Sequence, residues 1–143
     1  MTSRFALAVI ALLTLSTSAL AAVKKPTPLT ITGGELIDAA GMKPMWWGSQ
    51  ANLLIVDSRI VPEFREGHIP GSLNMPFAEM GALRAKLPAD KNHPLCFYCN
   101  GPKCWKSYDA ALLAIQWGYG KVYWFRDGLP AWRKAHLPVV IGN

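Results

Sequence analysis

Three cysteines lie within nine residues of one another, at Cys96, Cys99 and Cys104. The run Pro94–Lys106 places Cys99 at the end of a short apolar segment, ahead of a Gly-Pro turn and of an amphipathic helix expected to begin at about Cys104. The backbone N–H groups of such a loop, and the N-terminus of the helix behind it, favour a thiolate over a thiol and can hold an anion beside the sulfur. We therefore expect Cys99 to be an activated thiol.

The cysteine spacing indicates chemistry more than covalent cross-linking. Small secreted domains use disulfides to join distant segments, but these three cysteines all belong to one strand, loop and helix. An odd number also leaves at least one thiol unpaired. Cys96 lies within the apolar segment, so we expect its side chain to point to the opposite face from Cys99 and to be a buried structural thiol.

The first 21 residues have the pattern of a secretory signal peptide. A basic Arg4 precedes the apolar run Phe5–Leu15, and small residues follow in an A-x-A arrangement that predicts cleavage after Ala21. The apolar core is short for a span that needs roughly 20 residues, so we expect no stable membrane insertion after cleavage. The sequence then predicts an extended, mobile leader over 22–28, a single domain over 29–143 and a periplasmic location.

The distribution of charge along the chain indicates which kinds of binding partner to expect. The chain carries a formal net charge of +6 at pH 7, and its lysines and arginines are scattered along the sequence. A scattered basic surface argues against nucleic-acid binding and is compatible with a small anionic substrate. The three histidines show no spacing with the cysteines that is typical of a zinc site. We expect neither a metal nor a cofactor.

Short apolar runs alternate with helical patterns along the predicted domain. The strands are expected at 29–31, 52–56, 72–75, 95–98 and 121–125. The helices are expected at 35–40, 61–66, 77–87, 104–117 and 129–135, with an irregular aromatic loop over 42–50. The run at 52–56 is continuously apolar, as in a strand buried on both faces. The alternation predicts an α/β fold with one parallel sheet of about five strands, flanked by helices on both faces.

Chemistry-bearing residues follow two of these strands directly. Asp57 and Arg59 come after one strand, and Cys99 comes after another. Binding sites of parallel α/β sheets collect beyond the carboxyl ends of the strands. We therefore expect these residues at one edge of the sheet, where Asp57 and Arg59 would pair and support the rim of the site.

Three ordered segments resemble the signatures of the rhodanese family. The first combines Asp57–Arg59, Glu63-Phe64 and the run from Gly67 to Pro76. The second is Tyr98-Cys99, which opens a six-residue loop before a helix, and the third is the closing segment Val122–Trp132. The resemblance covers roughly residues 29–139 and implies a rhodanese-like fold.

The resemblance also implies an activity. Cys99 would attack the outer sulfur of a small anionic donor such as thiosulfate, hold it as a persulfide, and pass it to a thiol acceptor. The loop residues would hold the donor: Asn100, Gly101, Pro102, Lys103, Cys104 and Trp105. Members of the family are often monomeric, so a monomer is expected.

The active-site loop departs from the usual family pattern. Asn100 stands where arginine is common, Pro102 occupies the usual glycine place and contributes no N–H, and Cys104 stands where arginine or threonine is expected. The loop therefore lacks two basic positions that would bind thiosulfate.

Cys104 leaves alternatives open. It is either a resolving thiol that attacks a Cys99 persulfide or sulfenate, or a small buried residue at the helix start. The first alternative makes the protein a periplasmic thiol-disulfide or redox protein on the same scaffold. The Cys-x4-Cys-Trp spacing is similar to that of rhodanese-like periplasmic proteins associated with quinoprotein alcohol oxidation. A third alternative is a non-enzymatic module that carries sulfur or docks a partner through its Trp-rich surface.

Overall fold

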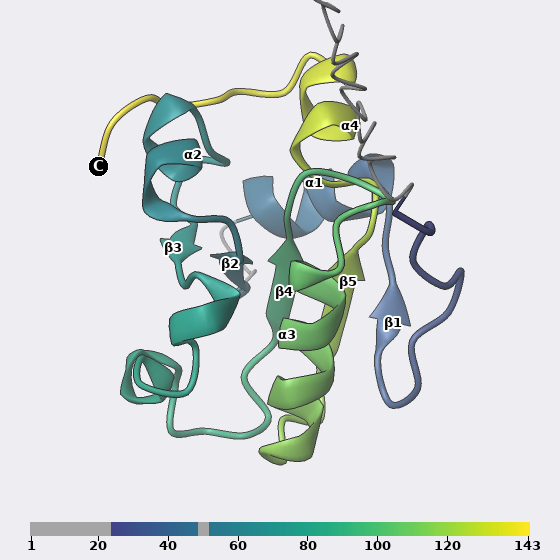
Figure 1. The fold of residues 1–143 in the computed structure, drawn as a ribbon, viewed down its shortest axis with the longest axis vertical. Coiled ribbons are helices and arrows are strands. Elements are labelled where there is room, and N and C mark those ends of the chain that lie inside the picture. Colours follow the sequence, from purple (N-terminus) through teal and green to yellow (C-terminus); the bar gives the residue numbers. More distant parts are fainter. Residues whose placement is uncertain (1–23, 49–51) are drawn as a thin grey trace, which may run out of the picture.

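The structure is a computed structural model that describes residues 24–48 and 52–143. The predicted signal peptide at 1–21 lies outside the described residues. One sheet forms the centre of the molecule, with α3 (Lys106–Gln116) in front of it and α1 (Ala39–Trp47) behind it in Figure 1. Within the described ranges, no helix is long and apolar enough to cross a bilayer.

The sheet has five strands, and every strand pair is parallel. Its spatial order is β1-β5-β4-β2-β3, so β4 is central and the predicted fold class is confirmed. The register pairs Asp57 with Tyr98 and Tyr98 with Phe125, which brings three strand ends to the same edge. The bounds are β1 Glu35–Leu36, β2 Leu54–Asp57, β3 Leu73–Asn74, β4 Leu95–Tyr98 and β5 Val122–Phe125.

Helices cover both faces of the sheet. The remaining ones are α2 (Val61–Glu66), α4 (Gly128–Lys134) and the short 3-10 helices η1 (Phe77–Glu79) and η2 (Arg84–Lys86). Side chains alternate along β4, so that Phe97 packs in the core under α3 while Cys96 and Tyr98 pack in the core under α1 and α4. The two cores are buried on either side of one layer of strands, which is the arrangement expected of a parallel sheet.

The N-terminal part of the domain differs from the sequence prediction. The predicted strand at 29–31 and helix at 35–40 are wrong, because Glu35–Leu36 forms the edge strand β1 against β5. The predicted aromatic loop contains α1 instead. Gly41 and Pro44 are poor helix formers, but the Asp38 side chain caps the first turn by accepting a hydrogen bond from the Gly41 N–H at 2.8 Å.

Tertiary packing holds α1 in place. Trp46 packs edge-on against Trp132 of α4, with ring centroids 5.3 Å apart, and its Nε1–H donates to the Pro70 carbonyl at 3.0 Å. Trp46 therefore covers the core. These contacts come from distant segments, which is why local propensity failed to predict the helix.

Two further helix predictions need correction. The single helix expected over 77–87 is two separate 3-10 turns, η1 and η2, with Gly81 between them. The α3 helix begins at Lys106, later than the predicted start at Cys104. The Cys104 N–H donates to the Gly101 carbonyl at 2.9 Å in a turn, so Cys104 belongs to the loop.

Candidate active site

Cys99 follows the central strand β4 directly and is fully enclosed. Its exposed fraction is 0%, and its thiol donates to the Cys104 carbonyl over a distance of 3.2 Å. Its Sγ also lies 3.0 Å from the hydroxyl oxygen of Ser107, in the first turn of α3. The structure therefore places Cys99 at the strand edge that the sequence predicted.

Ser107 connects the sulfur to the core. It is fully buried, and its Oγ accepts a hydrogen bond from the Trp124 Nε1–H at 3.1 Å. Because that oxygen already accepts from Trp124, its own O–H is free to donate to a sulfur anion at Cys99. Ser107 was not predicted from the sequence as a site residue. The available signal was its helical spacing with small residues on the inward face of α3, namely Ala110, Ala111 and Ala114.

The loop backbone packs tightly against the turn between β5 and α4. The Leu129 N–H donates to the Cys99 carbonyl at 3.0 Å. Gly128 has a φ of +61°, and a Cβ built on it would lie 2.2 Å from the Cys99 carbonyl oxygen. Only glycine fits at that distance and in that conformation. The closing segment thus fixes the position of the nucleophilic loop.

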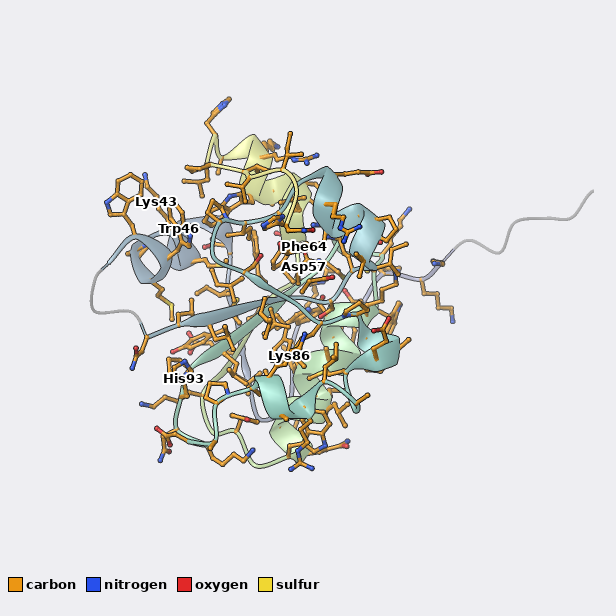
Figure 2. The ribbon with its side chains drawn as sticks, turned by 90° about the vertical axis from the view of Figure 1, so that its left-hand side faces the viewer. Lys43, Trp46, Asp57, Phe64, Lys86 and His93 are labelled. Carbon is orange, nitrogen blue, oxygen red and sulfur yellow. The ribbon has the colours of Figure 1, made fainter. Side chains whose placement is uncertain are left out.

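The predicted Asp57–Arg59 pair forms inside the protein. Both side chains are buried, and Arg59 Nη2 lies 2.5 Å from Asp57 Oδ2 and 2.7 Å from the Gly67 carbonyl oxygen. Asp57, labelled in Figure 2, lies in the interior at the end of β2. The pair ties β2 to the far end of α2, so it supports the element beside the loop.

Glu63 of α2 links this support to the loop itself. Its Oε1 accepts a hydrogen bond from Asn100 Nδ2 at 2.6 Å, and its Oε2 lies 3.7 Å from Lys106 Nζ. In the sequence, Glu63 stands out only as part of a family signature. Its contacts depend on the packing of α2 against the loop, which the sequence does not display.

Cys104 is the more accessible of the two loop cysteines. It is partly exposed and lines a surface pocket with lysines from two parts of the chain. The pKa of Cys104 is lowered to about 6, chiefly by hydrogen bonding with the Cys99 thiol. The N–H groups of Asn100 and Lys106 and the charge of Lys106 lower it further, against the effect of burial.

The pKa shifts of the two loop thiols run opposite to the activation that the sequence predicted for Cys99. The same interaction with Cys104, together with burial, raises the pKa of Cys99. Loop amides that were expected to stabilise a Cys99 thiolate stabilise the Cys104 thiolate instead. Burial and the contact with Cys104 thus favour the protonated form of Cys99, whereas the loop N–H groups favour the thiolate of Cys104.

Cys96 has no part in this network. It is fully buried on the opposite face of the sheet, and its Sγ lies 3.6 Å from the Met42 Sδ. Burial raises the pKa of Cys96 to about 12. A thiol in that state is unreactive, which agrees with the structural role predicted for Cys96.

The segment that precedes the domain packs over the loop. The backbone N–H and the Oγ1 of Thr27 both donate to the Pro102 carbonyl, at 2.7 and 2.8 Å. Trp105 Nε1–H donates to the Lys25 carbonyl at 3.0 Å, and Arg126 donates to both oxygens of Thr27. Residues 22–28 were expected to be a mobile leader, but Lys25 and Thr27 of this segment are hydrogen-bonded to the loop.

Comparison with known proteins decides the family. Residues 43–135 match the profile described as "Rhodanese-like domain". The chain belongs to the rhodanese-like family. A protein of Allochromatium vinosum named "Sulfurtransferase" is 33% identical over 89 residues, which are 62% of this rhodanese-like chain and 79% of that protein.

Further similarities are to part of a longer protein and to solved structures. An HTH-type transcriptional regulator of Mycobacterium tuberculosis is 39% identical over 85 residues, 59% of this chain and 36% of the regulator, so the chain spans about a third of that protein. A Pseudomonas aeruginosa thiosulfate sulfurtransferase structure has a TM-score of 0.67 at 22% identity, covering 77% of this chain and 21% of that one. A Bacillus halodurans protein structure has a TM-score of 0.66 at 24% identity, covering 75% and 77%. These structural likenesses show the rhodanese-like fold.

The rhodanese-like loop gathers most of the predicted substrate-binding residues in one place. Four of the six line the pocket beside Cys104: Asn100, Lys103, Cys104 and Trp105. The other two do not, since Gly101 is buried and the Pro102 carbonyl is taken by Thr27. Within residues 24–48 and 52–143, His, Cys, Asp and Glu side chains form no cluster able to hold a metal ion.

Proposed function

We propose that this protein is a sulfurtransferase that moves sulfane sulfur from a small anionic donor, such as thiosulfate, to a thiol acceptor through a persulfide on Cys99. The observation that carries the proposal is the place of the Cys99 sulfur, at the carboxyl end of the central strand and within 3.0 Å of the Ser107 hydroxyl oxygen. Membership of the rhodanese-like family and the relative named "Sulfurtransferase" support it.

The chemistry is a double displacement. In its direct form, Cys99 loses its proton to solvent, and its thiolate attacks the outer sulfur of thiosulfate. A new S–S bond forms while the bond to the sulfite group breaks, and sulfite leaves with the electron pair. The thiolate of the acceptor then attacks the outer sulfur of the persulfide, and Cys99 leaves as a thiolate. The Ser107 O–H donates to the sulfur anion in both states.

The test is turnover of thiosulfate and cyanide to thiocyanate and sulfite by the reduced protein. We expect Cys99→Ser to lower the rate by at least about a hundredfold, because it removes the nucleophile. Cys96→Ala is the matched control, since Cys96 is buried on the opposite face, and it should keep wild-type turnover. Equal turnover by the wild type and Cys99→Ser would contradict the assignment of Cys99 as the nucleophile.

The location and assembly of the protein are part of this proposal. We propose a periplasmic location on the ground of the signal pattern at 1–21, which lies outside the described residues. We also propose a monomer, as the family resemblance implies. The protein isolated from the periplasmic fraction should begin at Ala22 and elute as a monomer in size-exclusion chromatography. A cytoplasmic protein that begins at Met1 would contradict the proposed location.

A second candidate function is thiol-disulfide exchange. The observation that favours it is the contact of the Cys99 thiol with the main-chain carbonyl of Cys104, between two free cysteines whose pKa values are shifted in opposite directions. The Cys104 thiolate would attack an incoming disulfide and release one thiol. Cys99 would then lose its proton and attack the mixed disulfide, which closes the Cys99–Cys104 bond and releases the second thiol. Quinoprotein alcohol catabolism is the proposed context of this candidate.

Intact mass separates the candidates in protein purified without reductant. A gain of one sulfur at Cys99 supports sulfur transfer, and a loss of two hydrogens within residues 99–104 supports disulfide exchange. A binding module would show neither modification nor turnover, and it would retain a partner in pull-down experiments.

A further inference from the structure

We propose that the anionic sulfur donor first meets Cys104, in a lysine-lined pocket that the segment Lys24–Thr27 completes, and that the sulfur then passes inward to Cys99. The second step rests on the proposed function, whereas the pocket and its reactive thiol do not. Four features of the described residues carry this inference: access from solvent, charge, the anchoring of the N-terminal segment, and the contact of the Cys99 thiol with the Cys104 carbonyl.

The exposure of the two cysteines to solvent favours Cys104 as the first site of attack on the donor. Cys99 has an exposed fraction of 0%, while Cys104 is partly exposed. The pocket at Cys104 has a volume of about 670 Å³, ample for thiosulfate or a small organic persulfide, and Cys99 is not part of its lining. A donor that enters from solvent therefore reaches the Cys104 sulfur before the Cys99 sulfur.

The charge of the pocket favours an anion. Its lining includes four lysines, Lys24, Lys25, Lys103 and Lys106, against the two acids Glu63 and Asp109. Lys106 lies 3.7 Å from Glu63, but among the described residues the other three lysines form no ion pair. This excess of positive charge takes the place of the basic residues that the loop lacks.

Two of these lysines come from outside the region matched by the family. Lys24 and Lys25 precede residue 43, where the rhodanese-like match begins. They are held at the pocket because Trp105 donates to the Lys25 carbonyl and Thr27 donates twice to the Pro102 carbonyl. The N-terminal segment thus supplies half of the lysines around the pocket, and it is anchored on both sides of Cys104.

The transfer balances without an added oxidant. The Cys104 thiolate attacks the outer sulfur of thiosulfate, an S–S bond forms, and sulfite leaves with the electron pair of the broken bond. Cys99, whose thiol contacts the Cys104 main chain, then attacks the outer sulfur of this persulfide. Its proton passes to Cys104, which leaves as a thiol, and the persulfide remains on Cys99 beside the Ser107 hydroxyl.

The pocket is tested by alkylation of the reduced full chain with anionic iodoacetate and neutral iodoacetamide, read by peptide mass mapping. We expect Cys104 to react at least about tenfold faster than Cys99 with either reagent. The ratio of the iodoacetate rate to the iodoacetamide rate should fall about fivefold in the double variant Lys24→Gln, Lys25→Gln at low salt. Added salt should lower the same ratio in the wild type.

The matched control is the double variant Lys43→Gln, Lys86→Gln. Both lysines are exposed, lie outside the pocket lining, and are labelled in Figure 2. This control removes the same charge from the molecule and should leave the rate ratio unchanged. Alkylation of Cys99 as fast as Cys104, or an equal change of the ratio in both double variants, would overturn the proposed pocket.

The inward transfer is tested with thiosulfate and the two single variants. In Cys99→Ser, we expect Cys104 to gain one sulfur with release of one sulfite. In Cys104→Ser, with the melting temperature of the wild type, sulfur uptake on Cys99 should fall at least about tenfold. Wild-type uptake on Cys99 in Cys104→Ser would overturn the relay and leave the proposed function intact. No uptake by the wild type on either cysteine would refute the proposed function and the relay, while the alkylation ratios still decide the pocket.

Discussion

The thiols of Cys99 and Cys104 belong to one network but differ in their contact with solvent. Cys99 is enclosed between β4 and the first turn of α3, where a negative charge is costly, so its proton is retained. Cys104 lies on the outer side of the loop, where N–H groups and a lysine stabilise its thiolate. Two residues of the same type thereby acquire different chemistry from their surroundings alone.

This difference predicts the pH dependence of Cys104 reactivity. Only the thiolate attacks iodoacetamide, so the rate should rise with pH and reach half its maximum near pH 6, well below the ordinary pKa of 9.0. Cys99→Ala removes the largest cause of the lowered pKa and should move the midpoint upward. Cys96→Ala should leave the midpoint unchanged. A wild-type midpoint near 9.0 would contradict the assignment of the thiolate to Cys104.

At the scale of elements, the turn from β5 to α4 packs against the loop after β4 and holds its backbone in place. Both strands end at the same sheet edge because Tyr98 pairs with Phe125. The two following backbones then meet, and Gly128 lies against the Cys99 carbonyl that accepts from the Leu129 N–H. The contact is made by main-chain atoms, so it fixes the direction in which Cys99 leaves the strand.

Gly128→Ala should therefore destabilise the protein strongly. The new methyl group would lie 2.2 Å from the Cys99 carbonyl oxygen, and the residue would also have to keep a φ of +61°. We expect a loss of about 3 kcal/mol or more in the free energy of unfolding, measured by urea denaturation.

The matched control is Gly118→Ala. Gly118 also has a positive φ, of +93°, but a Cβ there would meet nothing within 4 Å. The Gly118→Ala substitution should lower the free energy of unfolding by only about 1 kcal/mol, because it introduces conformational strain alone. Equal losses for the two variants would show that the contact with Cys99 has no energetic role.

At the scale of the whole molecule, the candidate site is built from segments far apart in the sequence. Thr27 contacts Pro102 of the loop, 75 residues away in the sequence. Thr27 also accepts a hydrogen bond from Arg126, 99 residues away. Glu63 reaches Asn100 from α2 on the other side. The loop is thus held between the N-terminal segment, α2 and the turn before α4, and its position depends on the complete domain.

Thr27→Val should loosen this arrangement without unfolding the domain. The backbone N–H bond to Pro102 remains, but the hydroxyl bonds to Pro102 and from Arg126 are lost. We expect a loss of about 1 kcal/mol in stability and faster amide hydrogen exchange at residues 101–105. Thr30→Val, at an exposed position, should change neither quantity. Unchanged exchange in Thr27→Val would contradict the anchoring role of this segment.

The candidate site was predictable where its residues lie close together in the chain. Cys99, the loop after it and the Asp57–Arg59 pair follow strands, and strand ends can be read from apolar runs. Ser107, Glu63 and the two N-terminal lysines were missed as site residues because their roles arise from packing between elements. The opposite pKa shifts of Cys99 and Cys104 were also not predicted, since they depend on which sulfur is enclosed.

The amino-acid pattern alone determined the α/β class, the positions of four strands along the chain, the family signatures and the position of the reactive loop. These properties follow from local periodicity and from residue types at fixed spacings. The fold decided the edge strand β1, the helix α1 and the assembly of the lysine pocket, because each forms only against a distant partner. It also decided the protonation of the two thiols, because burial and hydrogen bonding exist only in the folded chain.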